Sequence, residues 1–168
     1  MKKDFFDSIV LDMGSVAKWG LCQEDIISDQ DIIARIEKIS DLEQKDRDGR
    51  TLLINAATNG RAEVVKYLLN RGASISAKDD ADFTSLHAGV LSNDIKTVEL
   101  LLEAGADVNA KNRFGNGPIM IGNYETDLDI FRVLIANGAD PEQKNNYGVS
   151  AKEIFACAEG ISEILNQK

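Results

Sequence analysis

Two landmarks recur along this chain of 168 residues with a constant period of 33 residues. The first landmark consists of Gly49, Asp82, Gly115 and Gly148, and the second consists of Gly-Ala pairs that begin at Gly72, Gly105 and Gly138. A period that two separate features keep over about a hundred residues is typical of a solenoid, in which each unit buries its apolar face against the next. The sequence therefore predicts a linear stack of similar units.

Each unit predicts two helices that follow a polar turn rich in Asp, Asn and Gly. Thr51 and Thr84 stand where the first helix needs an N-cap, and Pro118 falls in a first helical turn, where its missing N–H costs nothing. The second helix carries apolar residues at i, i+3 and i+4, and we expect a left-handed glycine cap at its end. Small residues recur in the first helix and should let neighbouring helices approach closely; they are Ala56, Gly89 and Gly122.

The pattern resembles the ankyrin repeat. Residues 84–87, Thr-Ser-Leu-His, and residues 105–110, Gly-Ala-Asp-Val-Asn-Ala, carry the family motif best. The resemblance covers residues 46–154 strongly, although Leu52 and Ser85 replace the family proline and Ile54 and Met120 replace its histidine. It implies an all-α ankyrin-type solenoid of helix–turn–helix units with β-turn tips, about five units including degenerate N- and C-terminal caps.

We expect one ankyrin repeat domain over residues 1–168. Its full repeats span residues 46–78, 79–111 and 112–144, and residues 145–168 form a truncated C-terminal cap repeat. Residues 1–45 are expected to form a degenerate N-terminal cap repeat, because residues 31–39 align with a second helix and Phe5, Ile9 and Met13 suggest a helix before it. The alternative is that residues 1–45 dock a partner.

The composition argues against several classes of function. The net charge of −9 disfavours nucleic acid, whose phosphates would be repelled. No stretch approaches the roughly 18 apolar residues of a membrane span, and the start of the chain lacks the clean apolar region of a signal peptide. Two cysteines at opposite ends of a stack imply no disulfide framework, so we expect a reducing compartment, the cytoplasm.

Few residues suggest chemistry. The single histidine, His87, occupies the histidine position of the ankyrin pattern, where the resemblance implies a structural role in hydrogen bonding between turns. Neither Cys22 nor Cys157 has a histidine nearby in sequence, so we expect no metal, no cofactor, no small-molecule substrate and no catalysis. The alternative from another class is a hydrolase or transferase hidden in residues 1–45, with Cys22 as its candidate nucleophile.

In ankyrin-like stacks, the turn tips and the inner side of the first helices line a concave face. Carried over by repeat position, this predicts a partner-binding site formed by Arg47, Arg50, Asp80, Phe83, Leu91, Arg113, Phe114, Tyr124, Glu125 and Tyr147. Asp48, Thr58 and Ala81 hold equivalent positions. Aromatic side chains and Arg dominate interface energetics, and we expect Phe83 and Tyr124 to act as contacts rather than as packing of their own turns.

Taken together, the residues predict a non-catalytic protein–protein interaction module that is a monomer when free. The acidic charge favours a basic protein partner, which long-range attraction would steer. The most concrete hypothesis is an acidic inhibitor, such as the immunity protein of a bacterial toxin, that occludes this partner through the concave face. The alternative is an adaptor or scaffold, or a secreted bacterial effector that binds host proteins.

Overall fold

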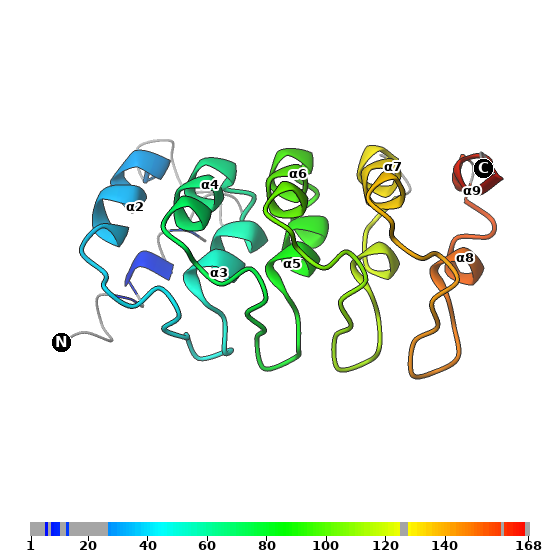
Figure 1. Cartoon of the computed structure of the whole chain (residues 1–168), viewed down its shortest axis with the longest axis horizontal. Helices are drawn as coiled ribbons and strands as arrows, with labels where there is room; N and C mark the ends of the chain where they lie inside the picture. Colours follow the sequence, from blue (N-terminus) through cyan, green and yellow to red (C-terminus); the bar gives the residue numbers. More distant parts are fainter. Residues whose placement is uncertain are drawn as a thin grey trace.

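The computed structural model describes residues 6, 8–10, 13, 27–124, 128–158 and 160–166. Its helices form two layers that run side by side along the stack (Figure 1). One layer holds α2 (Asp29–Ile36), α4 (Ala62–Asn70), α6 (Ile95–Glu103), α7 (Asp129–Ala136) and α9 (Ile161–Asn166). The other holds α3 (Leu52–Thr58), α5 (Ser85–Ser92), the 3-10 helix η2 (Pro118–Met120) and α8 (Ala151–Ile154). The predicted all-α solenoid of helix–turn–helix units is confirmed.

The ends of these helices follow from local side chains. The hydroxyl oxygens of Thr51 and Thr84 accept hydrogen bonds from the backbone of the first turns of α3 and α5, so the predicted N-caps are confirmed. Pro118 is the first residue of η2. Gly72, Gly105 and Gly138 end α4, α6 and α7 with φ between 84° and 88°, as expected for left-handed caps.

Long loops, which we call fingers, precede the first helices and extend below them in Figure 1. The fingers are residues 46–50, 79–83, 112–116 and 145–149. Each opens with an Asp or Asn whose Oδ1 accepts two backbone N–H groups of the same finger; in the second finger Asp79 accepts from Ala81 and Phe83, both at 2.8 Å. Asp46, Asn112 and Asn145 repeat this arrangement. Each finger is therefore held in shape by its own first side chain.

Backbone hydrogen bonds also join neighbouring fingers. The N–H of Asp80 donates to the carbonyl of Asp48 at 3.1 Å. The same bond recurs from Arg113 to Ala81 and from Asn146 to Phe114. A second series runs at the base of the fingers, where the Nζ atoms of Lys45, Lys78 and Lys111 donate to the carbonyl 33 residues further along the chain. Because these bonds connect units, they set the spacing of the fingers.

The core lies between the two helix layers and along the stack, where α3 packs on α5 and α4 packs on α6. The expectation that small residues allow close helix approach is confirmed at Gly89. A Cβ atom there would lie 3.2 Å from a methyl group of Thr97 and 3.3 Å from Leu101, both on α6. Ala56 is fully buried at the equivalent position of α3.

The third unit departs from its prediction. Its first helix is only the short η2, and Gly122 lies after it rather than within a helix. The ring of Tyr124 lies where a Cβ of residue 122 would project, and it packs edge-on against Phe131 and Phe155. The expectation of a helix through Gly122 and Tyr124 is therefore wrong, and the Tyr124 ring packs into the core instead.

The N-terminal segment packs on the first unit. Phe6, Ile9 and Met13 are helical and fully buried in the common core, whereas Phe5 lies outside the described residues. Buried Arg61, just before α4, donates from Nε to the Met13 carbonyl and from Nη1 to the Ile27 carbonyl, both at 3.1 Å. Its Nη1 also pairs with Asp29 at 2.6 Å. The Arg61 guanidinium therefore connects the first unit to two preceding segments, the N-terminal helical residues and the start of α2.

No helix in the described ranges is long and apolar enough to cross a membrane.

Candidate partner-binding site

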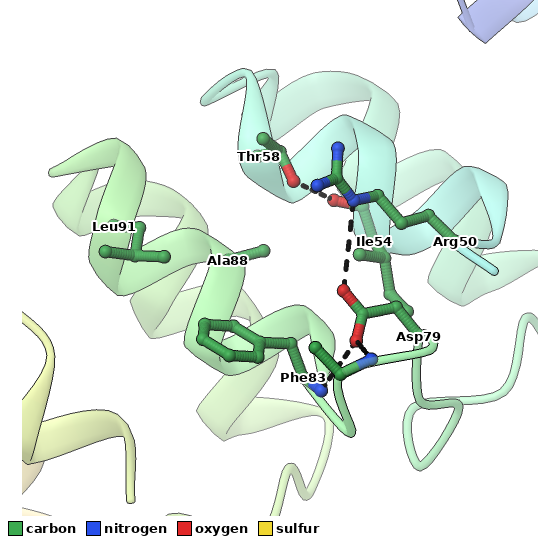
Figure 2. A pocket seen from close by; sticks show the side chains of 8 residues that line it. Arg50, Ile54, Thr58, Asp79, Phe83, Ala88 and Leu91 are labelled. Carbon is green, nitrogen blue, oxygen red and sulfur yellow. Dashed lines mark hydrogen bonds and ion pairs between the residues drawn. The ribbon is translucent and has the colours of Figure 1, made fainter. Parts of the chain in front are cut away.

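A pocket of about 290 Å³ opens between α3 and α5, above the second finger. Figure 2 shows Arg50 and Thr58 on one side and Phe83, Ala88 and Leu91 on the other. The full lining is Arg50, Ile54, Thr58, Asp79, Ala81, Phe83, Ala88 and Leu91. The sequence-predicted residues Arg50, Phe83 and Leu91 are therefore brought together at one place.

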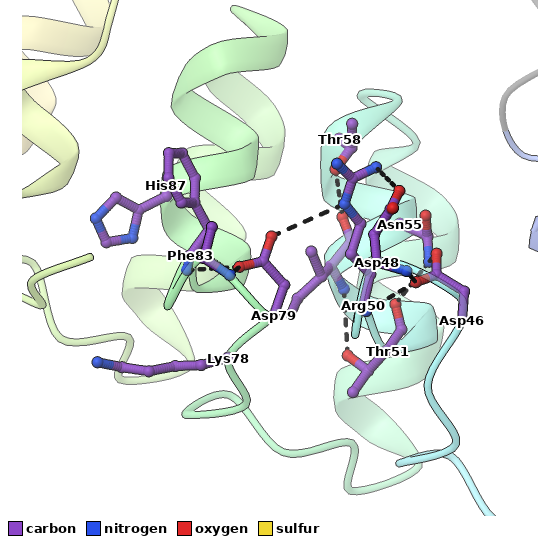
Figure 3. Close-up of polar contacts among 12 residues, drawn as sticks. Asp46, Asp48, Arg50, Thr51, Asn55, Thr58, Lys78, Asp79, Phe83 and His87 are labelled. Atoms are coloured by element: carbon purple, nitrogen blue, oxygen red, sulfur yellow. Dashed lines mark hydrogen bonds and ion pairs between the residues drawn. The ribbon is translucent and has the colours of Figure 1, made fainter. Parts of the chain in front are cut away.

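The polar side of the pocket is an acid–base pair. The Arg50 guanidinium Nε lies 3.8 Å from Oδ2 of Asp79, and its Nη1 lies 3.6 Å from Oδ2 of Asp48. Asp79 is mostly buried and keeps its other oxygen on the backbone of its own finger, as Figure 3 shows. Asp79 thus anchors Arg50 at the pocket mouth, where 36% of the arginine side chain remains exposed.

The apolar side of the pocket is formed by side chains whose own positions are set by the core. Ile54 and Ala88 are buried in α3 and α5 and form its inner wall. The Phe83 ring is half-buried against the His87 ring, with 5.1 Å between ring centroids. Leu91 projects from α5 with 56% of its surface exposed, an apolar side chain that a partner would shield from water.

His87 supports this wall from behind, and it is fully buried. Its Nδ1 accepts the backbone N–H of Thr84 at 3.2 Å, so the proton resides on Nε2, which donates to the Asn116 carbonyl at 3.1 Å. Burial lowers the pKa of His87, mainly through desolvation, and favours this neutral form. The predicted structural role, a hydrogen bond from one unit to the next finger, is confirmed.

The first two fingers give the pocket an acidic surrounding. They contain five acidic residues, which are Asp46, Asp48, Asp79, Asp80 and Asp82, against Arg47 and Arg50, so their net charge is −3. Asp48, Asp80 and Asp82 are exposed. Since exposed carboxylates beside an apolar hollow attract cations, this surface suits a positively charged ligand.

The remaining predicted contact residues differ in their exposure. Arg47, Asp80 and Arg113 are exposed on fingers, as are Phe114 at 43% and Tyr147 at 74% of their surface. They lie on the fingers around or beyond the pocket rather than in its wall. We call the exposed surface of the four fingers, with the adjoining exposed side of α3 and α5, the finger face.

One predicted residue, Tyr124, does not contribute to the finger face as expected. Tyr124 is only 3% exposed, so the prediction that its ring contacts a partner is wrong. The physical reason is that the chain after η2 is not helical and turns this ring into the core against Phe131 and Phe155. The same burial raises the pKa of the Tyr124 hydroxyl. Glu125 lies outside the described residues.

Sequence reasoning missed three pocket residues, Asp79, Ile54 and Ala88. Asp79 had a signal in the sequence, because Asp or Asn recurs at residues 46, 79, 112 and 145 with the period of the units. Ile54 and Ala88 had no such signal in the sequence, since an apolar residue in a half-buried helix is predicted to lie in the core. Their exposure to a cavity depends on how far apart α3 and α5 stand.

Nothing in the described part of the chain forms a group of three or more His, Cys, Asp or Glu side chains able to hold a metal ion. His87 has no solvent access and cannot reach a substrate. Cys157 is exposed, and Cys22 lies outside the described residues.

Comparison with known proteins agrees with this geometry. The family model for ankyrin repeats (three copies) matches residues 26–112. The mouse (Mus musculus) ankyrin repeat and SAM domain-containing protein 6 is 36% identical over 63 residues, which are 37% of this chain and 7% of that protein. The chain thus spans only a small part of the length of this relative.

Proposed function

Because this chain belongs to the ankyrin repeat family, whose repeats are generally protein–protein interaction modules, we propose that it is a non-catalytic binding protein that occludes a basic protein partner. The partner would bind the finger face. In its most concrete form, the proposal is an acidic inhibitor of the immunity type. Occlusion requires only that the partner's functional surface be covered, so a protein without catalytic groups suffices.

The observation that carries the proposal is the combination of charge and exposed apolar side chains on the finger face. The whole chain has a net charge of −9, and the first two fingers contribute −3 of it. The same face exposes Leu91, Phe114 and Tyr147. Acidic charge speeds encounter with a basic protein, and exposed aromatic and aliphatic anchors then give the bound complex its lifetime.

The test is affinity capture from the native lysate with the tagged protein, compared with a Leu91→Ala/Phe114→Ala variant. Both substitutions remove apolar side chains of which large fractions, 56% for Leu91 and 43% for Phe114, are exposed. Ile95→Ala is the matched control, because Ile95 is a partly exposed apolar residue on α6, in the other helix layer. We expect one basic partner that the double variant loses and the control retains.

The salt dependence of capture and the partner's own activity then distinguish an inhibitor from an adaptor. Raising the salt concentration from about 50 to 300 mM should weaken capture, since exposed charges are screened. The captured partner's own activity should fall when the protein is added in equal amount. Capture of two partners at once would support the adaptor alternative, and no captured partner under any condition would refute the proposal.

A further inference from the structure

We propose that the pocket between α3 and α5 receives one large apolar side chain of a partner segment, and that a Lys or Arg beside it pairs with Asp48 and Asp80. The inference rests on the proposed protein-binding function and adds to it the anchor point and the chemistry of the bound segment. Its occupant is a basic segment of another protein with a single apolar anchor residue.

The size and opening of the pocket favour one side chain. Its volume of about 290 Å³ lies just below the roughly 300–1,000 Å³ of small-molecule pockets, so it has room for one large side chain. Leu91 and Phe83 offer it the exposed apolar contacts, and the buried side chains of Ile54 and Ala88 close the inner wall. A buried apolar anchor in a well-formed pocket is the usual centre of a protein interface.

The pocket walls are held in place before any partner binds. Asp79 is fixed by two backbone N–H groups and in turn holds Arg50. The Phe83 ring packs against the His87 ring, and both nitrogens of the His87 ring are hydrogen-bonded. Because these groups do not have to be ordered on binding, the entropic cost of association is reduced.

Charge decides which segment the pocket accepts. Asp48 and Asp80 are exposed, and the backbone hydrogen bond from Asp80 to Asp48 places these two residues next to each other on adjacent fingers. Arg50 lies within 4 Å of carboxylates of Asp48 and Asp79, so it offers little to an acidic ligand. An approaching Lys or Arg, in contrast, meets two exposed aspartates on adjacent fingers, Asp80 and Asp48, the latter 3.6 Å from Arg50.

The first experiment tests the pocket with a defined probe. Random 12-residue peptides displayed on phage are selected against the full chain, and the enriched peptides are synthesised. We expect a shared pattern of one Leu, Met or Phe within a few residues of Lys or Arg. Peptides without a basic residue or without a large apolar residue, or no enrichment at all, would overturn the proposal.

Substitutions at Thr58 provide a matched pair for the pocket itself. Thr58 is an exposed lining residue of α3, so Thr58→Trp fills the hollow from its rim, whereas Thr58→Ala removes the same hydroxyl and leaves it open. Urea unfolding of both variants is the control that checks whether each keeps the fold. We expect Thr58→Trp to weaken peptide binding at least about tenfold and Thr58→Ala less than about threefold. Equal affinities of the two variants would overturn the proposal.

Charge reversal tests the acidic rim. The Asp48→Lys/Asp80→Lys variant should weaken peptide binding about tenfold and abolish most of its salt dependence. Glu99→Lys/Glu103→Lys changes the net charge by the same amount on exposed positions of α6 and should leave the affinity unchanged. A rim variant that binds as tightly as the control would contradict the role of these two aspartates.

The outcomes also separate this inference from the proposed function. If a basic partner is captured from the lysate and its binding survives Thr58→Trp and the rim variant, the finger face binds elsewhere and only the pocket inference fails. If neither a partner nor a peptide binds, both fail.

Discussion

The bonds between fingers can be tested by adding a single methyl group at two equivalent glycines. Gly49 and Gly148 occupy the same position of the first and last fingers, with φ of 75° and 78°. A Cβ atom at residue 49 would lie 2.8 Å from the backbone nitrogen of Asp80 in the next finger and would meet its carboxylate. A Cβ atom at residue 148 would have nothing within 4 Å. The pair Gly49→Ala and Gly148→Ala therefore isolates the packing of one finger on another.

The expected magnitudes follow from these surroundings. Both substitutions place alanine in the left-handed region, which costs about 1–2 kcal/mol, and the loss of glycine's freedom in the unfolded chain returns about 0.4–1 kcal/mol. For Gly148→Ala the net loss is about 1 kcal/mol. Gly49→Ala must also push the second finger away and break the hydrogen bond from Asp80 to Asp48, which adds about 2 kcal/mol of overpacking and lost bonding.

The assay is urea unfolding followed by circular dichroism. With a denaturant slope of about 2 kcal/mol per molar, Gly49→Ala should unfold about 1 M earlier than Gly148→Ala. Gly115→Ala is a further control and should behave like Gly49→Ala, because its Cβ would lie 2.8 Å from the backbone nitrogen of Asn146. If Gly49→Ala and Gly148→Ala unfold at the same urea concentration, the fingers do not pack as described and the reasoning is refuted.

Three further predictions concern single residues. Asp82 has a φ of 60° where the other fingers have glycine, so Asp82→Gly should stabilise the fold by up to about 0.5 kcal/mol, and a lower urea midpoint would contradict this strain. Burial lowers the pKa of His87 in the folded protein, so the unfolded chain takes up a proton first as the pH falls below about 6.5. The free energy of unfolding should then decrease by up to about 1.4 kcal/mol per pH unit, until the pH reaches the pKa of His87 in the folded protein. His87→Leu should be about 2 kcal/mol less stable at pH 8, and the difference between the two proteins should shrink on acidification; a constant difference from pH 8 to 5 would refute the assignment. Arg61→Ala should lower the free energy of unfolding, measured by heat or urea, by about 2–3 kcal/mol, because two carbonyls and the Asp29 carboxylate lose a donor. A decrease of less than about 0.5 kcal/mol would show that this guanidinium does not hold the N-terminal segment.

Much of the stack could be predicted because its determinants are local or periodic. Thr51 and Thr84 cap their helices through bonds to residues three positions away, and Gly72 ends α4 by its own backbone conformation. The resemblance to a known repeat also predicted the structural role of His87 correctly. Its ring bonds to Thr84 in its own unit and to Asn116 in the next, and both positions are set by the repeat.

The third unit shows where the same reasoning fails. The period alone places Tyr124 on the exposed side of a first helix. In the structure that helix is the short η2, which ends at Met120, and the Tyr124 ring is buried against Phe131 and Phe155. Whether a ring points outward or inward depends on the space that the neighbouring unit leaves, and this space includes Phe155 from 31 residues further along the chain.

The repeating architecture and the caps at Thr51, Thr84 and the three Gly-Ala pairs could be predicted from the amino-acid sequence, because each depends on residue type at fixed local spacing. The grouping of Arg50, Asp79, Phe83 and Leu91 around one pocket, in contrast, becomes visible only once the units are assembled. These residues come from two units and three elements, and the distance between α3 and α5 follows from side chains packed between the units. A cavity is space left by such packing, so its position is a property of the assembled stack.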